Sequence, residues 1–424
     1  MLIHVVKPGE SLWQISAYYR VPIAGIIDVN KLPNPNQLVI GQALVIPTKD
    51  IFHTVSAGES LWQIAKRYGI SLQTLLTANN IQNPNLIYPG TVLIISGKLR
   101  PIIDVNAYIY QFGEQAAPIV MENGKDLTYL SPFAYRIGEN GGLQPIDDTT
   151  AIRTAYAVNV VPIMSITNFT SSELGENLAH VVLGTPEIRE RTITNIIAVA
   201  KEKGYAGVNI DFENVLSSDR ELYNGFLQRA VDRLHPEGLF VSTALAPKTS
   251  AVQQGLLYEA HDYEAHGRIV DFVILMTYEW GYRLGPPQAI SPLNQIKRVL
   301  DYAVSVIPRK KIFFGFQLYA RDWVLPHVNG QEAETFSNQE AILRAVRNGA
   351  AIQYDVVAES PFYRYRNRQG IMHEVWFEDA RSAQAKFDTV KNYNLRGISY
   401  WVLGYPFPQN WALLEDNFTI RKLI

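Results

Sequence analysis

The sequence predicts an α/β protein, a (β/α)8 TIM barrel with a small α+β insertion, preceded by two small modules of the order strand, helix, helix, strand. Two observations predict this architecture. The first hundred residues contain an internal repeat that aligns Asn30 with Asn79, and eight strand-like runs alternate with helical runs through the rest of the chain. In such a barrel, functional side chains are expected at the C-terminal ends of the strands.

The composition fits a globular chain of more than one domain. It has 424 residues, of which 47% are hydrophobic and 18% charged. No apolar run reaches the roughly 18 residues of a membrane span, so no membrane insertion is expected. Residues 1–10 lack a basic region followed by an apolar stretch, so we expect no secretory signal and synthesis in the cytosol.

The absence of cysteine excludes disulfides, thiolate zinc sites and a cysteine nucleophile. The eight histidines are scattered without metal-ligand spacing, so neither a metal site nor a cofactor is predicted. The formal charge of −2 argues against a nucleic-acid partner.

The repeat begins in residues 7–15, KPGESLWQI, which return as SAGESLWQI at 56–64. Each copy reads as a strand, two helices, an Asn-Pro loop and a final strand, the last of them expected at Val92–Ser96. We expect domains at 1–48 and 51–97. Both copies resemble LysM domains, modules that bind polymers containing N-acetylglucosamine, and this resemblance implies a glycan partner such as peptidoglycan or chitin.

Two loops of each module can present backbone donors and acceptors to acetamido groups. They lie around Gly9–Ser11 and Asn34–Val39, with counterparts at Gly58–Ser60 and Asn83–Ile87. Residues 1–100 hold 8 Lys and Arg against 4 acids, a balance that would favour an anionic polymer, although basic residues are usually only a solvated face.

Trp13 and Trp62 are expected in the cores of the modules, because each lies at helical spacing with apolar neighbours such as Leu12 and Ile15. The other interpretation is a sugar platform.

The barrel is expected over residues 101–424, after a junction at Gly97–Pro101. The eight strand-like runs are Ile102–Tyr110, Leu127–Tyr135, Asn159–Ile166, Gly207–Phe212, Phe240–Leu245, Ile269–Thr277, Ile312–Gln317 and Gly397–Val402. Helical runs lie between them, such as Glu187–Lys203 with Gly204 as its stop. A segment rich in Tyr, Arg and Phe, about 350–378, is expected to be the insertion.

The fourth run places Asn209, Asp211 and Glu213 on one face, because side chains alternate along a strand. Two carboxylates one pleat apart raise the pKa of at least one of them, and burial adds to the shift. One could then stay protonated as a general acid. The alternative is that they end the strand and cap the next helix, but Ser218 and Glu221 are expected to supply that cap as a capping box.

Residues 206–213 resemble the DGxDxDxE signature of family 18 glycoside hydrolases, the chitinase group. Gly207, Asp211 and Glu213 match, while Ala206 and Asn209 depart from the signature. Three further stretches are similar to this family: Met276–Trp280 to its MxYD, with Glu279 in place of Asp; Phe314–Trp323 to its substrate-lining segment; and the strand that ends at Trp401.

The resemblance implies hydrolysis of a β-linked N-acetylglucosaminide with retention, in which the substrate's own acetamido oxygen attacks the anomeric carbon. Glu213 would protonate the leaving oxygen and later activate water. Asp211 would hold the acetamido N–H, and the Tyr278 hydroxyl would fix its oxygen. Substrate contacts are expected from Asn209, Glu279, Gln317, Tyr319, Arg321 and Trp401, the last as a platform under the sugar.

Asn209 stands where the family usually has Asp. Its amide can donate a hydrogen bond to Asp211 but cannot accept a proton from it. Asp211 is therefore expected to ionise more simply than a paired aspartate.

LysM modules joined to such a barrel fit two polymers, chitin and peptidoglycan. Without a secretory signal, the combination resembles the spore-associated glycosidases of endospore-forming bacteria. We therefore predict an N-acetylglucosaminidase that acts on spore cortex peptidoglycan or its fragments and is deposited in the coat and cortex region. The alternatives are a chitinase or chitooligosaccharide hydrolase, and an inactive glycan-binding protein; Glu213 argues against the latter, because lectins of this fold usually lack that acid.

Overall fold

The computed structural model describes residues 1–48, 51–95, 100–169 and 173–424. Ser96, at the end of a predicted strand, Gly97, at the predicted end of the second module, and Lys98 and Leu99 of the predicted junction lie outside the described residues. Within the described ranges, no helix combines the length and apolar character needed to cross a membrane.

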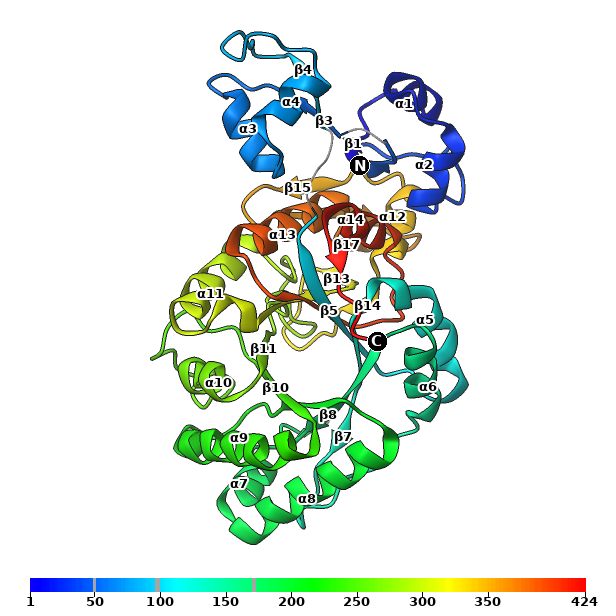
Figure 1. The fold of residues 1–424 in the computed structure, drawn as a ribbon. Helices are drawn as coiled ribbons and strands as arrows, with labels where there is room; N and C mark the ends of the chain where they lie inside the picture. Colours follow the sequence, from blue (N-terminus) through cyan, green and yellow to red (C-terminus); the bar gives the residue numbers. More distant parts are fainter. Residues whose placement is uncertain (49–50, 96–99, 170–172) are drawn as a thin grey trace.

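Eight parallel strands form a closed barrel (Figure 1). They are β5 (Ile102–Ile109), β6 (Tyr129–Pro132), β8 (Val161–Thr167), β9 (Gly207–Asp211), β10 (Phe240–Leu245), β11 (Phe272–Leu275), β12 (Ile312–Gln317) and β18 (Gly397–Trp401). β18 pairs with β5 and closes the circle. Two short strands lie beside it, β7 (Tyr135–Arg136) on β8 and β19 (Thr419–Ile420) on β5. The predicted barrel is confirmed.

An outer ring of helices covers the barrel. Its members are α5 (Ala116–Asn123), α6 (Thr149–Ala157), α7 (Glu176–Gly184), α8 (Pro186–Lys203), α9 (Arg220–Leu234), α10 (Tyr263–Ile269), α11 (Leu293–Val306), α13 (Ala380–Tyr393) and α14 (Pro408–Asn417). Their apolar faces join the outward side chains of the strands in one core. α8 ends at Gly204 in the left-handed conformation (φ 77°), as its sequence predicts.

A second, antiparallel sheet follows the seventh barrel strand. It contains β13 (Tyr319–Leu325), β14 (Glu334–Ser337), β15 (Gln353–Asp355), β16 (Ser360–Arg366) and β17 (Met372–Trp376), and α12 (Asn338–Arg347) packs on it. The segment 350–378 supplies β15–β17, but the sheet begins at Tyr319. Only Leu318 separates β12 from β13, so the sequence reads as one continuous strand at this point.

The two N-terminal modules share one construction. The first has β1 (Leu2–Val5), α1 (Leu12–Tyr19), α2 (Ile23–Asn30) and β2 (Ala43–Ile46); the second has β3 (Ile51–Thr54), α3 (Leu61–Tyr68), α4 (Leu72–Ala78) and β4 (Val92–Ile95). The Asn30 amide donates to the carbonyls of Ile26 (2.8 Å) and Val45 (2.7 Å). Asn79 makes the same two bonds in the second module. The repeated asparagine therefore ties the second helix to the last strand.

The prediction that Trp13 and Trp62 are core residues is wrong, because their side chains are 69% and 59% exposed. Leu12 and Ile15 occupy the inward face of α1. One residue along a helix turns the side chain by about 100°, so Trp13 points to solvent.

The capping box predicted from Ser218 and Glu221 is also wrong. A 3-10 turn over Ser217–Asp219 comes first, and α9 begins at Arg220 without a side-chain cap. The Ser337 hydroxyl does cap α12, where it accepts the Glu340 N–H at 3.0 Å.

The first module is docked on the catalytic unit through the loop between α2 and β2 (residues 31–42) and the two residues that flank it, Asn30 and Ala43. The Gln409 amide, at the start of α14, donates to Asn30 Oδ1 (2.8 Å) and to the Ala43 carbonyl (2.9 Å). The Ile352 N–H donates to the Ile40 carbonyl at 2.9 Å. These buried polar bonds fix the module's orientation.

A pair of glycines at equivalent positions tests this docking. Gly41 (φ +83°) and Gly90 (φ +87°) share the left-handed conformation, but a Cβ atom would lie 1.8 Å from the Ile352 carbonyl oxygen at Gly41 and would meet nothing within 4 Å at Gly90. Both alanine variants are expected to lose about 1–2 kcal/mol to backbone strain. Only Gly41→Ala should also undock its module and lower the melting temperature of the full chain further. Equal losses in thermal unfolding would contradict tight docking.

Candidate active site

The predicted site residues gather at the C-terminal ends of four barrel strands. Asp211 ends β9 with Glu213 two residues beyond, Tyr278 follows β11, Gln317 ends β12 and Trp401 ends β18. Gly207, at the start of β9, has the Phe240 ring 2.4 Å from where a Cβ atom would stand, so a larger residue would displace that ring.

Asp211 is a buried carboxyl group with an unused acceptor. Among the described residues, its Oδ1 atom has no hydrogen-bond partner. Burial, and then repulsion from Glu213, raise the pKa of Asp211 well above its usual value. The expectation that Asp211 ionises simply is therefore wrong, because desolvation favours its neutral form.

Glu213 is set up as a proton donor. Burial raises the pKa of its carboxyl group to about 7, and the neighbouring Glu279 adds to the shift. Asn168, just beyond β8, holds its backbone from both sides: Asn168 Oδ1 accepts the Glu213 N–H (2.9 Å), and the Asn168 amide donates to the Glu213 carbonyl (2.8 Å). A carboxyl group that titrates near neutral pH can both give and take a proton.

Asn209 lies one layer deeper in the barrel and is fully buried. Its oxygen accepts the Tyr108 hydroxyl at 2.8 Å, and its amide donates to Ser242 Oγ at 3.0 Å. The predicted hydrogen bond from Asn209 to Asp211 is therefore wrong: the amide donates to Ser242 on β10, and Asp211 Oδ1 is left without a partner among the residues that the structure describes. Asn209 shapes the floor of the site instead.

Glu279, Tyr319 and Arg321 form one cluster. Arg321 donates to both carboxylate oxygens of Glu279 (3.0 and 2.8 Å), and the Tyr319 hydroxyl donates to the same group. Glu279 has a positive φ of 73°, a conformation seldom adopted by a residue of this type. The bidentate pair orients the carboxylate whose charge acts on Glu213.

Tyr278 is partly buried beside the carboxyl groups. Burial, together with the charges of Asp211 and Glu213, raises the pKa of its hydroxyl well above the usual value. The hydroxyl therefore stays protonated and can serve as a hydrogen-bond donor.

Gln317 is fully buried and its amide is already engaged. It donates to Glu378 at 2.8 Å and accepts the Ser291 hydroxyl. Glu378 in turn pairs with Lys386 at 2.7 Å, and both are buried. Gln317 thus links the end of β12 to a buried ion pair.

Trp401 forms an aromatic wall. The centroid of its ring lies 4.8 Å from that of Phe133 and 5.4 Å from that of Tyr108, both in edge-to-face geometry. It also shares an apolar cluster with Tyr278 and Trp376. Flat apolar walls with a few polar groups are typical of sites for sugars and other small ligands.

Sequence reasoning missed His261. Its Nδ1 accepts the Ala246 N–H at 2.8 Å, so Nε2 must carry the proton that it donates to the Phe212 carbonyl at 2.9 Å. Burial lowers its pKa to about 4, which keeps the ring neutral and this arrangement intact. Nothing near it in the sequence marks a lone histidine as a partner of residue 212.

Asn168 was also missed, although its position directly after a strand end could have identified it. Within the described part of the chain, no group of three histidine or acidic side chains could hold a metal ion.

A closed parallel barrel with one buried and one partly buried carboxyl group beside a tyrosine and a tryptophan defines a glycosidase site. The chain belongs to family 18 of the glycosyl hydrolases, whose family pattern it matches over residues 104–405. LysM domains match over residues 4–47 and 53–96.

The chain is similar to particular proteins over its whole length. It is 50% identical to the cortical fragment-lytic enzyme of Bacillus subtilis (strain 168), over 100% of this chain and 99% of that protein. Its fold matches the crystal structure of the Bacillus megaterium spore cortex-lytic enzyme SleL with a TM-score of 0.88 and 41% identity, over 100% of this chain and 99% of the other. The Bacillus cereus SleL structure matches with a TM-score of 0.90 and 38% identity, over 99% and 98%.

We predict that His261 positions Glu213. His261→Ala removes the donor to Phe212, the residue between the two acids, and should lower kcat by about tenfold to a hundredfold through misplacement. KM on a soluble N-acetylglucosaminide should change little, and His261→Gln should recover part of the rate because its amide can still donate. A proportionate rise in KM, or no recovery with Gln, would point to a general loss of structure.

Proposed function

We propose that this protein is an N-acetylglucosaminidase that hydrolyses spore cortex peptidoglycan or its fragments by a retaining, substrate-assisted mechanism. The observation that carries the proposal is the pairing of Glu213, whose pKa is about 7, with the unpartnered Asp211 oxygen. Similarity over the full chain to a cortical fragment-lytic enzyme supports the choice of polymer. We further propose domains at 1–48, 51–97 and 101–424.

The first step requires a proton donor and an oriented acetamido group. Protonated Glu213 donates to the leaving glycosidic oxygen while the acetamido oxygen attacks the anomeric carbon. Asp211 accepts the acetamido N–H through its free oxygen, and the Tyr278 hydroxyl donates to the acetamido oxygen. As positive charge develops on the ring formed by the acetamido group, the Asp211 oxygen that accepts its N–H stabilises that charge. Ionised Glu213 then takes a proton from the attacking water.

The surrounding residues serve this centre in different ways. Trp401 supplies the apolar surface under the sugar. Arg321 and Tyr319 hold Glu279, which helps to set the pKa of Glu213. Asn209 and Gln317 hold the strands in place through buried hydrogen bonds to Ser242 and Glu378. No step uses a metal or a cofactor.

Two other functions remain to be compared with this one. A chitinase would use the same centre on chitin, and a glycan-binding protein would bind sugar at the same residues without turnover. Mass spectrometry of the products from spore cortex and from chitin, measured side by side, distinguishes the three. Products from cortex alone support the proposal.

We also propose that the protein is deposited in the coat and cortex region of the spore, as the relatives' names suggest.

Glu213→Gln tests the proton donor. The amide keeps the shape of the side chain but cannot deliver a proton, so kcat should fall by about 10²–10⁴-fold while substrate binding is preserved. Binding can be followed by calorimetry with a soluble oligosaccharide. A variant with a large share of wild-type activity would remove Glu213 from this role.

The pH dependence tests the influence of Glu279. Since Glu213 must be protonated, kcat/KM should fall as the pH rises through about 7. Glu279→Gln removes a negative charge that raises the pKa of Glu213, so the alkaline limb should move to lower pH. The matched control is Glu332→Gln, an exposed acid paired with Arg283. An unmoved limb in Glu279→Gln would show that Glu279 does not tune the donor.

A further inference from the structure

The two LysM modules present the same loop to different surroundings. In the first module, residues 31–42 contact the catalytic unit: Val39 joins the apolar cluster of the second sheet, and the Ile40 carbonyl accepts the Ile352 N–H. The equivalent residues 80–91 of the second module have no comparable contact among the described residues.

The exposed fractions show the consequence. Val39 and Ala43 are 8% and 1% exposed, whereas their equivalents Tyr88 and Val92 are 67% and 57% exposed. Together with exposed Leu86, the latter two form what we call the ridge of the second module. Large apolar side chains that are exposed and concentrated within residues 86–92 indicate a surface available for binding.

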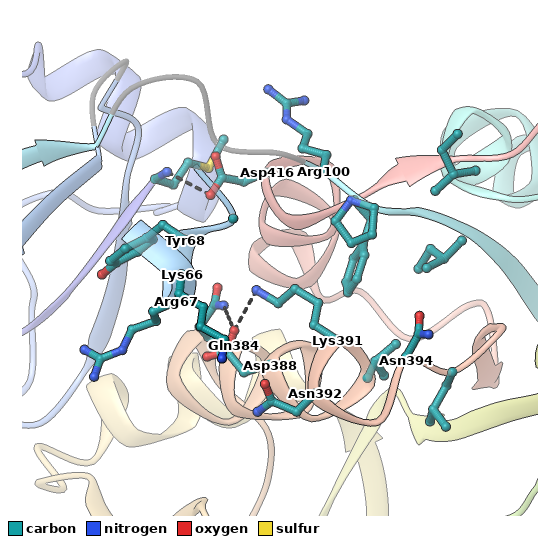
Figure 2. Close-up of a pocket in the computed structure, with 18 of the residues that line it drawn as sticks. Lys66, Arg67, Tyr68, Arg100, Gln384, Asp388, Lys391, Asn392, Asn394 and Asp416 are labelled. Carbon is teal, nitrogen blue, oxygen red and sulfur yellow. Dashed lines mark hydrogen bonds and ion pairs between the residues drawn. The ribbon is translucent and has the colours of Figure 1, made fainter. Parts of the chain in front are cut away.

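The ridge lies apart from the place where the second module meets the barrel. A hollow of about 980 Å³ lies between the second module and the barrel. It is lined by Lys66, Arg67 and Tyr68 at the end of α3 and by residues of α13 (Figure 2). None of the described residues 83–92 lines this hollow. The ridge therefore stays free while the module sits beside the barrel.

The chemistry around the ridge selects its ligand. Residues 70–95 contain no acidic or basic side chain, while the amides of Gln82, Asn83 and Asn85 are exposed beside the ridge. A neutral surface lacks the cations that a phosphate polymer requires. A flat aromatic ring with aliphatic neighbours and neutral amides fits the apolar faces of sugar rings and their acetamido groups.

We infer that the second module alone holds the polymer, through Leu86, Tyr88 and Val92, and that its ligand is a neutral strand of acetamido sugars. The first module is a docked spacer, because the catalytic unit covers Val39 and Ala43, its equivalents of Tyr88 and Val92. This inference rests on the proposed function for the identity of the polymer.

The test uses the full chain with matched tyrosine variants. Tyr88→Ala should weaken sedimentation with insoluble peptidoglycan by about tenfold, the usual loss for an aromatic anchor. Tyr18→Ala, at a tyrosine of the first module that is 78% exposed, should stay within about twofold of the wild type. Turnover of a soluble N-acetylglucosaminide should be unchanged in both.

Equal losses in the two variants, or no loss in Tyr88→Ala, would overturn the inference. A wild-type chain that binds through Tyr88 yet releases no product would support the inference and overturn the proposed hydrolysis, so the two failures are distinct. Hydrogen exchange gives a second readout that needs no ridge variant. With Glu213→Gln and a soluble N-acetylglucosamine oligosaccharide, amides in 83–92 should gain protection, and a gain in 34–41 instead would refute the assignment.

Discussion

The chemistry of the site depends on the desolvation of two carboxyl groups at the end of one barrel strand. Asp211 is buried and Glu213 is partly buried, so their charged forms are disfavoured and both pKa values rise. The barrel tolerates this cost because the backbone around them is held firmly: Asn168 clamps Glu213, and His261 bonds the carbonyl between the two acids. Reactivity at neutral pH is therefore a property of the packing around β9, more than of the acids alone.

The layers around this pair divide the work between chemistry and support. Glu279 acts on Glu213 at a distance and is itself fixed by Arg321 and Tyr319. Gln317, at the end of β12, is held by a hydrogen bond to Glu378, which forms a buried ion pair with Lys386. Such a pair is weak evidence for stability, but it specifies one arrangement, since either partner left alone would be an uncompensated buried charge. The site is thus built from contacts that extend well beyond the substrate.

Much of this could be predicted from the sequence, because strand alternation is a local property. The eight strands, the repeat and the polar face of β9 all follow from short windows of residues. What the sequence concealed depended on distant partners. Trp13 has the spacing of a core residue but lies on the outward face of its helix. The Asn209 amide could donate to Asp211 on its own strand or to a residue on a neighbouring strand. It donates to Ser242 on β10, and a strand pairing of this kind is not visible in the sequence around Asn209. His261 lies far along the chain from Phe212, so no local pattern could join them.

Gly41 and Gly90 occupy the same position of a repeat and have the same backbone conformation, but different constraints require glycine at each. At Gly90 only the dihedral angle favours glycine, whereas at Gly41 the neighbouring carbonyl of Ile352 leaves no room for any side chain. The two copies of the module are therefore no longer interchangeable. They form an asymmetric pair: the catalytic unit restricts which residues the first copy can carry at its docked surface, whereas no such neighbour among the described residues restricts the second copy at Gly90.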